Sequence, residues 1–216
     1  MAARSKVIDL RNLIAERFPQ AQPPPPARIV TGLRALDEAT GGGLPKGAIT
    51  ELTSPQVSAG SALLVHRLLQ AAHAEQYFIA LIDGRDSFDP QALGNRRLRN
   101  LLWIRCTKTL DAIKAADLLL RDGNFPVVIL DLVLNAAEEL RKIPQTSWYR
   151  LQRLVEPAPT AFLILTRRSI ISSAQLKIVL ENRWRLKDLQ TEDNFARLKF
   201  HVQRVHGGRQ EVMRAG

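Results

Sequence analysis

Cysteine is almost absent from this chain. Its 216 residues include one cysteine, Cys106, which excludes a disulfide framework and any multi-cysteine zinc site. Four histidines, His66, His73, His201 and His206, are not spaced like the paired ligands of a motif such as H-E-x-x-H. The sequence therefore predicts no metal site, and a chain of this length can be stabilised by its apolar core alone.

Long hydrophobic runs are absent as well. No stretch approaches the ~18 uninterrupted apolar residues that span a bilayer, and charges interrupt residues 1–17 throughout. We therefore expect no membrane segment and no signal peptide. The expected location is the cytoplasm, where the single thiol stays reduced.

Positive charge, in contrast, is in clear excess. The chain has 31 Lys+Arg against 21 Asp+Glu, a formal net charge of +10, and the excess is concentrated in residues 96–125 and 161–216. Such clusters are typical of surfaces that bind a polyanion or an acidic protein. The alternative is a solvated basic surface that keeps the protein soluble.

The first 27 residues predict a separate N-terminal element. Residues 5–18 have the spacing of an amphipathic helix, and the linker that follows contains four consecutive prolines, 23–26. A short helix on a stiff tether cannot bury its apolar stripe alone, so it must dock on its own body or on another molecule. The stripe, which we expect to contact a partner, consists of Leu10, Leu13, Ile14 and Phe18.

From residue 28 onward, apolar runs alternate with helical patterns. Expected strands cover 48–52, 77–82, 101–106, 127–132 and 161–166, and expected helices cover 61–75, 109–121 and 145–155, with another from residue 90. Continuous apolar strands indicate a mostly parallel α/β sheet with helices on both faces. Residues 182–189 and 196–205 predict an antiparallel hairpin at one edge. We thus expect a core over 28–206 and a short tail over 207–216.

The loop after the first expected strand is where an α/β fold would bind a ligand. Residues 54–61, S-P-Q-V-S-A-G-S, stand where a phosphate-binding loop would read G-x-x-x-x-G-K-[ST]. Ser54 and Ala59 replace the two glycines, Gly60 replaces the lysine, and only Ser61 matches. The anion nest of backbone amides and the cation for the β- and γ-phosphates are therefore both missing.

The surrounding motifs resemble the core of the RecA recombinase family. Residues 31–37, T-G-L-R-A-L-D, and 41–47, G-G-G-L-P-K-G, are similar to its entry segment, and 54–61 then lie in register with its G-P-E-S-S-G-K-T loop. Residues 78–90 resemble its D-A-E-H-A-L-D-P segment with the strand before it, and 127–131 resemble its Walker B strand, ending in Asp131. The resemblance covers residues 29–189 and implies a RecA-like fold of the P-loop NTPase type.

The departures from this family fall on its chemistry. Arg85 stands where the family has the glutamate that activates water, and an arginine cannot act as a general base. Thr166 and Arg167 replace the Asn-Gln pair that senses the γ-phosphate. Asp131 and Ser61 remain, but they cannot hold a nucleotide without the phosphate cradle, so we expect backbone groups to satisfy Asp131. We therefore expect no cofactor and no catalytic residue: a pseudo-ATPase, not an enzyme.

Two regions correspond to the loops with which RecA proteins hold single-stranded DNA. They are residues 134–145, after the Walker B strand, and a shortened segment, 166–173, after the next strand. Trp148 and Tyr149 follow the first region, either as stacking platforms or as helix core. Basic side chains in both regions predict weak, salt-sensitive DNA binding that does not read sequence; these residues are Arg141, Lys142, Arg167 and Arg168.

Two groups of inactive RecA-like proteins fit this pattern. The ImuA group is encoded in damage-inducible cassettes beside an inactive Y-family polymerase homologue (ImuB) and an error-prone polymerase. The SulA group blocks cell division by binding the tubulin-like division protein. The N-terminal helix and tether, the full T-G-L-x-x-L-D segment and the basic C-terminal region resemble ImuA more closely.

The resemblance to ImuA implies a non-catalytic accessory protein in SOS mutagenesis and translesion synthesis. Its expected partners are RecA, the ImuB-type homologue, the error-prone polymerase and single-stranded DNA. A SulA-like division inhibitor is the alternative from another functional class. An ATP-dependent recombinase would need a nucleotide site that these residues do not supply.

Overall fold

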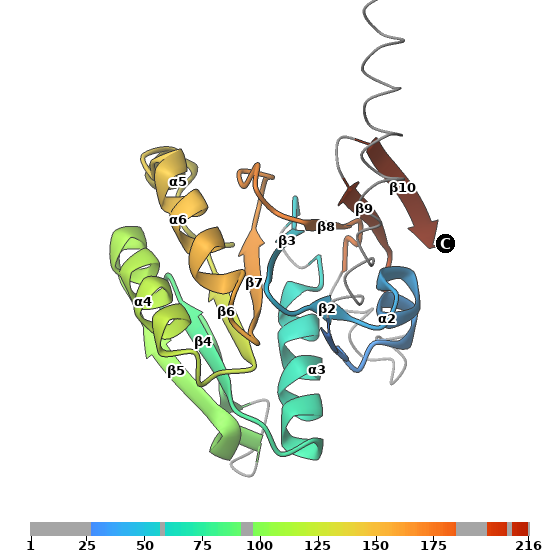
Figure 1. The fold of residues 1–216 in the computed structure, drawn as a ribbon, viewed down its shortest axis with the longest axis horizontal. Coiled ribbons are helices and arrows are strands. Elements are labelled where there is room, and N and C mark those ends of the chain that lie inside the picture. Colours follow the sequence, from blue (N-terminus) through green and yellow to red (C-terminus); the bar gives the residue numbers. More distant parts are fainter. Residues whose placement is uncertain (1–26, 57–58, 92–96, 185–197, 207–208, 216) are drawn as a thin grey trace, which may run out of the picture.

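An eight-stranded sheet forms the centre of the molecule in a computed structural model (Figure 1), with the strand order β10-β9-β8-β3-β7-β6-β4-β5. The structure describes residues 27–56, 59–91, 97–184, 198–206 and 209–215, with only the backbone at 97, 204–206 and 209–215. The predicted N-terminal helix, with Leu10, Leu13, Ile14 and Phe18, lies outside the described residues. Within them, no helix is long and apolar enough to cross a membrane.

Six neighbouring strands of the sheet run parallel and two at one edge run antiparallel. The parallel strands are β3 (Ala48–Thr53), β4 (Ile79–Asp83), β5 (Leu101–Arg105), β6 (Val127–Asp131), β7 (Ala161–Thr166) and β8 (Leu176–Leu180). The antiparallel strands are β9 (Phe200–His206) and β10 (Arg209–Ala215). A separate ribbon pairs β1 (Arg28–Ile29) with β2 (Leu44–Pro45).

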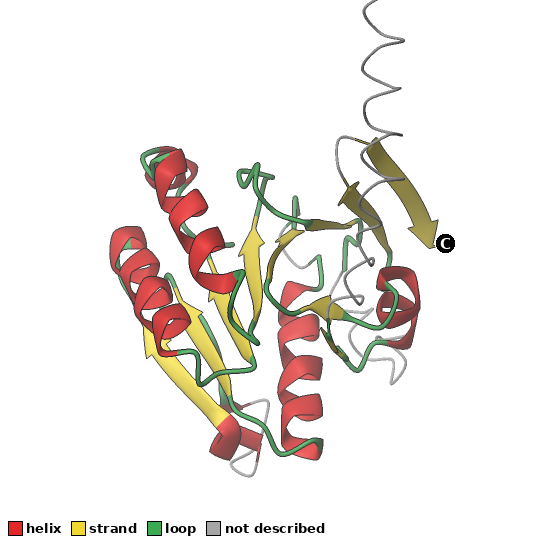
Figure 2. Ribbon diagram, viewed as in Figure 1, coloured by secondary structure: helices red, strands yellow, loops and turns green. Residues whose placement is uncertain are grey.

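Helices cover both faces of the parallel strands (Figure 2). One face packs against α2 (Arg34–Thr40) and α3 (Ser61–Ala74), and the other against α4 (Thr109–Asp122), α5 (Ala137–Arg141) and α6 (Gln145–Val155). A 3-10 turn, η2 (Arg97–Asn100), precedes β5. Every residue of β3, β4 and β7 is buried, which explains the nearly continuous apolar runs of β4 and β7; β3, in contrast, also buries Thr50, Glu51 and Thr53.

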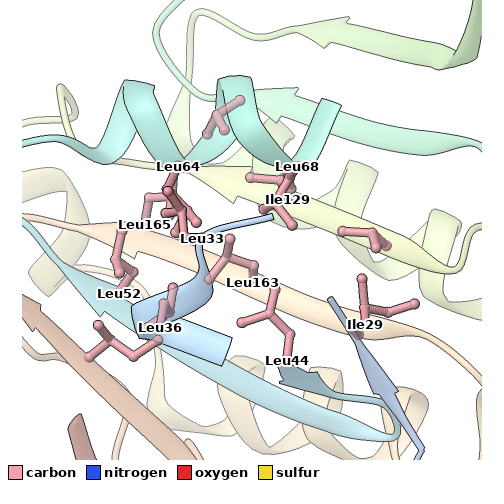
Figure 3. Packing of buried hydrophobic residues seen from close by; sticks show 14 of the residues in the cluster. Ile29, Leu33, Leu36, Leu44, Leu52, Leu64, Leu68, Ile129, Leu163 and Leu165 are labelled. Atoms are coloured by element: carbon pink, nitrogen blue, oxygen red, sulfur yellow. The ribbon is translucent and has the colours of Figure 1, made fainter. Parts of the chain in front are cut away.

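The T-G-L-R-A-L-D segment packs on the α3 side of the sheet and is held there by buried leucines and hydrogen bonds. Leu33 and Leu36 are buried in the same cluster as Leu64 of α3, as Figure 3 shows. The carboxylate of Asp37 accepts hydrogen bonds from the backbone N–H of Thr31 at 2.9 Å and from its hydroxyl at 2.8 Å. This motif therefore holds α2 against the core.

The α/β class, the mostly parallel sheet and the antiparallel edge are confirmed, and β7 and α6 have the bounds expected from the sequence. The strand that pairs antiparallel with β9 is β8, Leu176–Leu180; of the strand expected over 182–189, residues 182–184 are not in a strand and 185–189 lie outside the described residues. The strand β10 lies within the expected tail and extends the sheet. Residues 137–141, expected as loop, form α5. Of the helix expected from residue 90, residues 92–96 lie outside the described part.

Trp148 belongs to the core and is not a stacking platform. Its side chain is 1% exposed and packs in the cluster between the sheet, α4 and α6, whereas the neighbouring Tyr149 is 51% exposed.

We expect Trp148→Ala to lower the free energy of unfolding by about 3–5 kcal/mol, because it leaves a cavity in a packed core. Tyr149→Ala is the matched control and should change stability by no more than about 0.5 kcal/mol. Chemical denaturation of both variants measures the difference. Equal effects would contradict the assignment of Trp148 to the core.

Candidate functional site: the carboxyl edge of the sheet

The loops that follow the parallel strands all lie at one edge of the sheet, where ligands bind in folds of this class. Strand β7 separates β3, which precedes the loop 54–61, from β6, which ends in Asp131. In the register of these strands Thr53 pairs with Thr166, and Leu165 pairs with Asp131. Two strand spacings, about 10 Å, therefore separate the backbones of β3 and β6 here.

The position of the phosphate-binding lysine is closed by the chain itself. Gly60 precedes α3 with φ at +108°, a left-handed conformation that favours glycine. A Cβ atom on Gly60 would lie 2.6 Å from Cδ1 of Leu198, which is too close for any side chain unless Leu198 moves. Asn182 Nδ2 and Trp184 Nε1 both lie 3.7 Å from the same point. Residues of the C-terminal segment thus pack where a lysine side chain would begin.

The two positions of the missing glycines are also buried, whereas Pro55 and Gln56 between them are exposed. Ser54 and Ala59, which replace the two glycines, are each 1% exposed. The backbone N–H of Ser54 donates to the carbonyl of Thr166 at 2.7 Å, so the start of the loop continues the pairing of β3 with β7. Val57 and Ser58 lie outside the described residues.

Asp131 is satisfied by the backbone, as the sequence predicted. Its Oδ1 accepts a hydrogen bond from the N–H of Val133 at 2.9 Å. Burial raises the pKa of Asp131 to about 6; the hydrogen bond from Val133 opposes this shift, and the negative charge of Asp83 adds to it. Among the described residues, no group of three or more His, Cys, Asp or Glu side chains could hold a metal ion.

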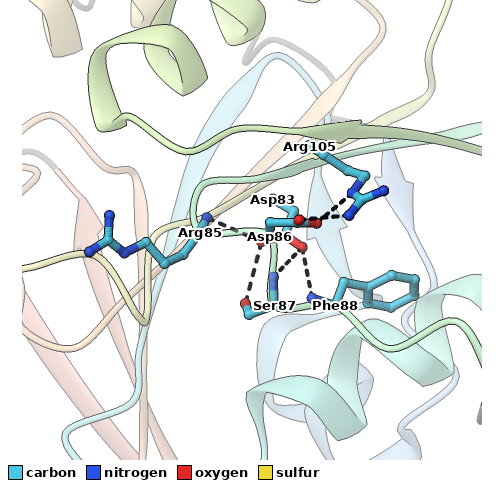
Figure 4. Close-up of polar contacts among 6 residues, drawn as sticks. All are labelled: Asp83, Arg85, Asp86, Ser87, Phe88 and Arg105. Atoms are coloured by element: carbon cyan, nitrogen blue, oxygen red, sulfur yellow. Dashed lines mark hydrogen bonds and ion pairs between the residues drawn. The ribbon is translucent and has the colours of Figure 1, made fainter.

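A second carboxylate, Asp83, holds the loop that follows β4 (Figure 4). Asp83 is 1% exposed, and its Oδ2 accepts from the N–H groups of Ser87 and Phe88, both at 2.7 Å. Its Oδ1 accepts from the N–H of Arg85 at 3.2 Å. Asp83 was not singled out from the sequence, although a carboxylate at the end of a buried strand is a recognisable signal.

Arg85, at the position of the family's glutamate, points away from the other labelled side chains in Figure 4. Its guanidinium donates to the carbonyl of Thr107 at 3.3 Å and lies 3.9 Å from Oε1 of Glu139 on α5. The hydroxyl of Thr109 donates to the other oxygen of Glu139 at 2.6 Å. That hydrogen bond and, more weakly, the charge of Arg85 lower the pKa of Glu139. Arg85 therefore makes two long polar contacts at the surface, one with the loop after β5 and one with α5.

The neighbouring Gly84 marks a second close contact at this edge. The amide of Asn135 donates to the carbonyl of Gly84 at 3.1 Å and to Thr109 Oγ1 at 2.8 Å. A Cβ atom on Gly84 would lie 2.6 Å from Asn135 Oδ1 and 2.7 Å from the carbonyl oxygen of Asp131. In this chain the end of β4 therefore approaches β6 so closely that only glycine fits at position 84. The family segment D-A-E-H has alanine at this position.

The four basic residues predicted to contact DNA follow the neighbouring strands β6 and β7: Arg141 and Lys142 lie at the end of α5, and Arg167 and Arg168 lie in the loop after β7. All four side chains are exposed, and none forms an ion pair with a described residue. The structure thus brings both predicted regions to one edge of the sheet; the residues are Arg141, Lys142, Arg167 and Arg168.

Sequence reasoning missed a second residue that organises this edge, Glu51 in the middle of β3. It is 0% exposed, and its carboxylate accepts from the hydroxyl of Ser169 at 2.7 Å and from the N–H groups of Ile170 and Ile171 at 2.7 and 3.1 Å. The ammonium of Lys177 lies 3.2 Å from the same carboxylate. The signal was present, since a lone carboxylate inside the run A-I-T-E-L-T requires partners.

Comparison with known proteins agrees with this arrangement. The model of the RecA N-terminal domain matches residues 24–142, which is more than half of the chain. The chain belongs to the RecA N-terminal domain family. The RecA protein of Frankia alni is 34% identical over 113 residues, covering 51% of this chain and 32% of its own length.

Two further RecA proteins show the same extent of similarity. That of Rubrobacter xylanophilus is 36% identical over 111 residues, or 50% of this chain and 32% of its own length. That of Acidothermus cellulolyticus is 36% identical over 108 residues, which is 49% of this chain and 31% of its own length. The matched part of this RecA-family chain thus spans about a third of the length of these relatives.

The raised pKa of Asp131 predicts a pH-dependent effect of Asp131→Asn. Between pH 4 and 6 the unfolded carboxyl ionises before the folded one, so the parent protein loses stability as pH rises through this window. The asparagine keeps an acceptor for Val133 and avoids this loss. The variant should therefore be more stable than the parent at pH 7, by about 2 kcal/mol, and this gain should disappear below pH 4.

Unfolding at a series of pH values measures this difference, and an NMR titration of the Asp131 carboxyl carbon provides an independent reading. A midpoint near pH 4 for that carbon, together with a pH-independent effect of the substitution, would contradict the prediction.

Proposed function

We propose that this RecA-family chain is a non-catalytic accessory protein of the ImuA type, acting in damage-induced mutagenesis and translesion DNA synthesis. In this role it binds RecA and the translesion polymerase components, an ImuB-type homologue and an error-prone polymerase, and contacts single-stranded DNA. The observation that carries the pseudo-ATPase part of this proposal is the packing of Leu198 against Gly60, at the position of the phosphate-binding lysine.

The state of the neighbouring positions supports the same conclusion. Phosphoryl transfer needs a cation on the transferred group and a residue that orients the attacking water. Here the lysine position is glycine, and the position of the water-activating glutamate is Arg85, which is paired with Glu139. Asp131 remains, but one of its carboxylate oxygens accepts a backbone hydrogen bond, and the lysine position that would bring phosphate to it is glycine.

The partner contact is assigned to the N-terminal segment. The family resemblance implies that an N-terminal helix joins neighbouring RecA subunits, and the stripe of Leu10, Leu13, Ile14 and Phe18 would occupy the same groove on RecA. A subunit without a nucleotide interface could not pass the contact on, so it would cap or limit the filament. The basic side chains at the carboxyl edge of the sheet would meanwhile meet the phosphates of a single strand.

The first test concerns nucleotide. We expect no ATP hydrolysis above background and no nucleotide-dependent rise in melting temperature, either in the parent protein or in Gly60→Lys. The substituted side chain clashes with Leu198 and sits at a positive φ, so it should cost about 1–3 kcal/mol of stability instead of creating a site. Gly60→Ala is the control, since it has the same Cβ contact and the same positive φ but no ammonium group. Micromolar ATP binding that Asp131→Asn removes would refute the pseudo-ATPase assignment.

The second test concerns DNA. Charge reversal of Arg167 and Arg168 should weaken binding of a single-stranded oligonucleotide, because phosphate contacts are lost. The slope of log affinity against log salt concentration should fall by about 0.7 for each contact. Arg141→Glu with Lys142→Glu should act in the same direction. Lys114→Glu is the control, since Lys114 is exposed on α4 and already paired with Asp111. Unchanged binding in both double variants would place the DNA contact elsewhere.

The third test concerns partners. Leu13→Asp with Ile14→Asp in the full chain should abolish capture of RecA from damaged cells, since two charges interrupt the apolar stripe. The melting temperature of the core should stay nearly unchanged, which separates loss of docking from unfolding. Undiminished capture would move the interface away from the N-terminal segment. Recovery of the tubulin-like division protein in place of RecA and the polymerases would favour the SulA-like alternative.

A further inference from the structure

Glu51 occupies a position where a carboxylate is costly. Its side chain is completely buried in β3, and removing a carboxylate from water is unfavourable unless charge and hydrogen bonds replace the water. The replacements come from two other parts of the chain. Ser169, Ile170 and Ile171 lie in the loop after β7 and supply three hydrogen bonds, and Lys177 of β8 supplies the opposite charge.

These contacts anchor the segment directly after Arg167 and Arg168. On the other side of the two arginines, Thr166 is the last residue of β7, and its carbonyl accepts the N–H of Ser54. The arginine pair therefore spans a two-residue arch between two points that are both hydrogen-bonded to the β3 segment. Ile171, at the end of the anchored segment, is itself 0% exposed.

The charges at this arch do not cancel. The ammonium of Lys177 neutralises Glu51 and also donates to Ser169 Oγ at 2.8 Å. Arg167 and Arg168 are exposed and have no ion-pair partner among the described residues. Lys177 thus compensates the buried charge of Glu51. The positive charges of Arg167 and Arg168 remain uncompensated within the described part of the chain, and the backbone that carries them is held by hydrogen bonds on both sides.

We propose that Glu51 is a positioning residue for nucleic-acid binding: it holds Arg167 and Arg168 in a preformed arrangement against which the phosphate backbone of a single strand binds. This inference rests on the proposed DNA contact and deepens it. A preformed loop loses little conformational freedom on binding, so two arginines contribute more than they would on an unanchored segment.

Glu51→Ala tests the proposal. It removes all four contacts, and binding of a single-stranded oligonucleotide at low salt should weaken about tenfold. Glu51→Gln keeps an acceptor for the two amides and should recover most of the affinity. Asp83→Asn is the matched control, because Asp83 is a buried carboxylate that clamps a different loop by the same kind of hydrogen bonds. It should lower the melting temperature without changing DNA binding.

A double-mutant cycle identifies the route of the effect. If Glu51 acts through the arginines, Glu51→Ala should have no further effect on DNA binding in a protein that already carries Arg167→Ala and Arg168→Ala. Additive losses, or unchanged affinity in Glu51→Ala, would overturn the proposal. A parent protein that binds no single strand would instead refute the DNA contact itself, and the positioning role would fall with it.

Hydrogen exchange of the parent protein gives a test that needs no substitution and holds even if Glu51→Ala does not fold. The amides of Ile170 and Ile171 should be protected to the same degree with and without the oligonucleotide, because their acceptor is already in place. Protection that appears only on adding DNA would show that the loop is ordered by binding and would contradict a preformed arch.

Discussion

Two carboxylates that are shielded from solvent, Glu51 and Asp83, determine the shape of the carboxyl edge of the sheet. Parallel strands leave their connecting loops at one edge, and the amides of those loops have no ladder partner. Glu51 accepts the amides of the loop after β7, and Asp83 accepts those of the loop after β4. Each loop is therefore ordered from inside the core, and its outward-facing side chains become fixed features of the surface.

This chain keeps core-packing residues of the RecA family's entry segment and differs from the family motifs at Gly60 and Arg85. The T-G-L-R-A-L-D segment is kept because Leu33 and Leu36 fill the core and Asp37 fastens Thr31. The differences at Gly60 and Arg85 lie in loops, and in each case the surrounding structure uses the new residue. Gly60 admits Leu198, and Arg85 joins Thr107 and Glu139. Gly60 thus belongs to a packed contact, whereas Arg85 makes polar contacts at the surface.

The sequence predicts the elements that depend on local residue patterns better than the contacts between residues far apart in the chain. Local apolar runs located β3, β6, β7 and α6, and Gly123 at φ +70° ends α4 as expected from the sequence pattern. The strand β8 was not predicted because it is short and its partner β3 is far away in the sequence. The strand β10 was not predicted because its residues, R-Q-E-V-M-R-A, show no regular alternation of apolar and polar side chains. The hydrogen bond from Ser169 to Glu51 joins residues 118 positions apart in the sequence. The contact between Leu198 and Gly60 joins residues separated by a similarly long stretch of chain. A single sequence carries no signal for such contacts beyond an unusual residue type, such as the glutamate inside β3.

The close contacts at Gly60 and Gly84 also bear on how the chain can change over evolutionary time. A larger residue at position 60 meets the tip of the Leu198 side chain, which can shift, whereas an alanine at position 84 meets the carbonyl oxygen of Asp131 in the β6 backbone. The two positions therefore differ in how they tolerate a return to the family residue. Position 60 can change once one side chain moves, but position 84 can change only if two strands of the sheet move apart.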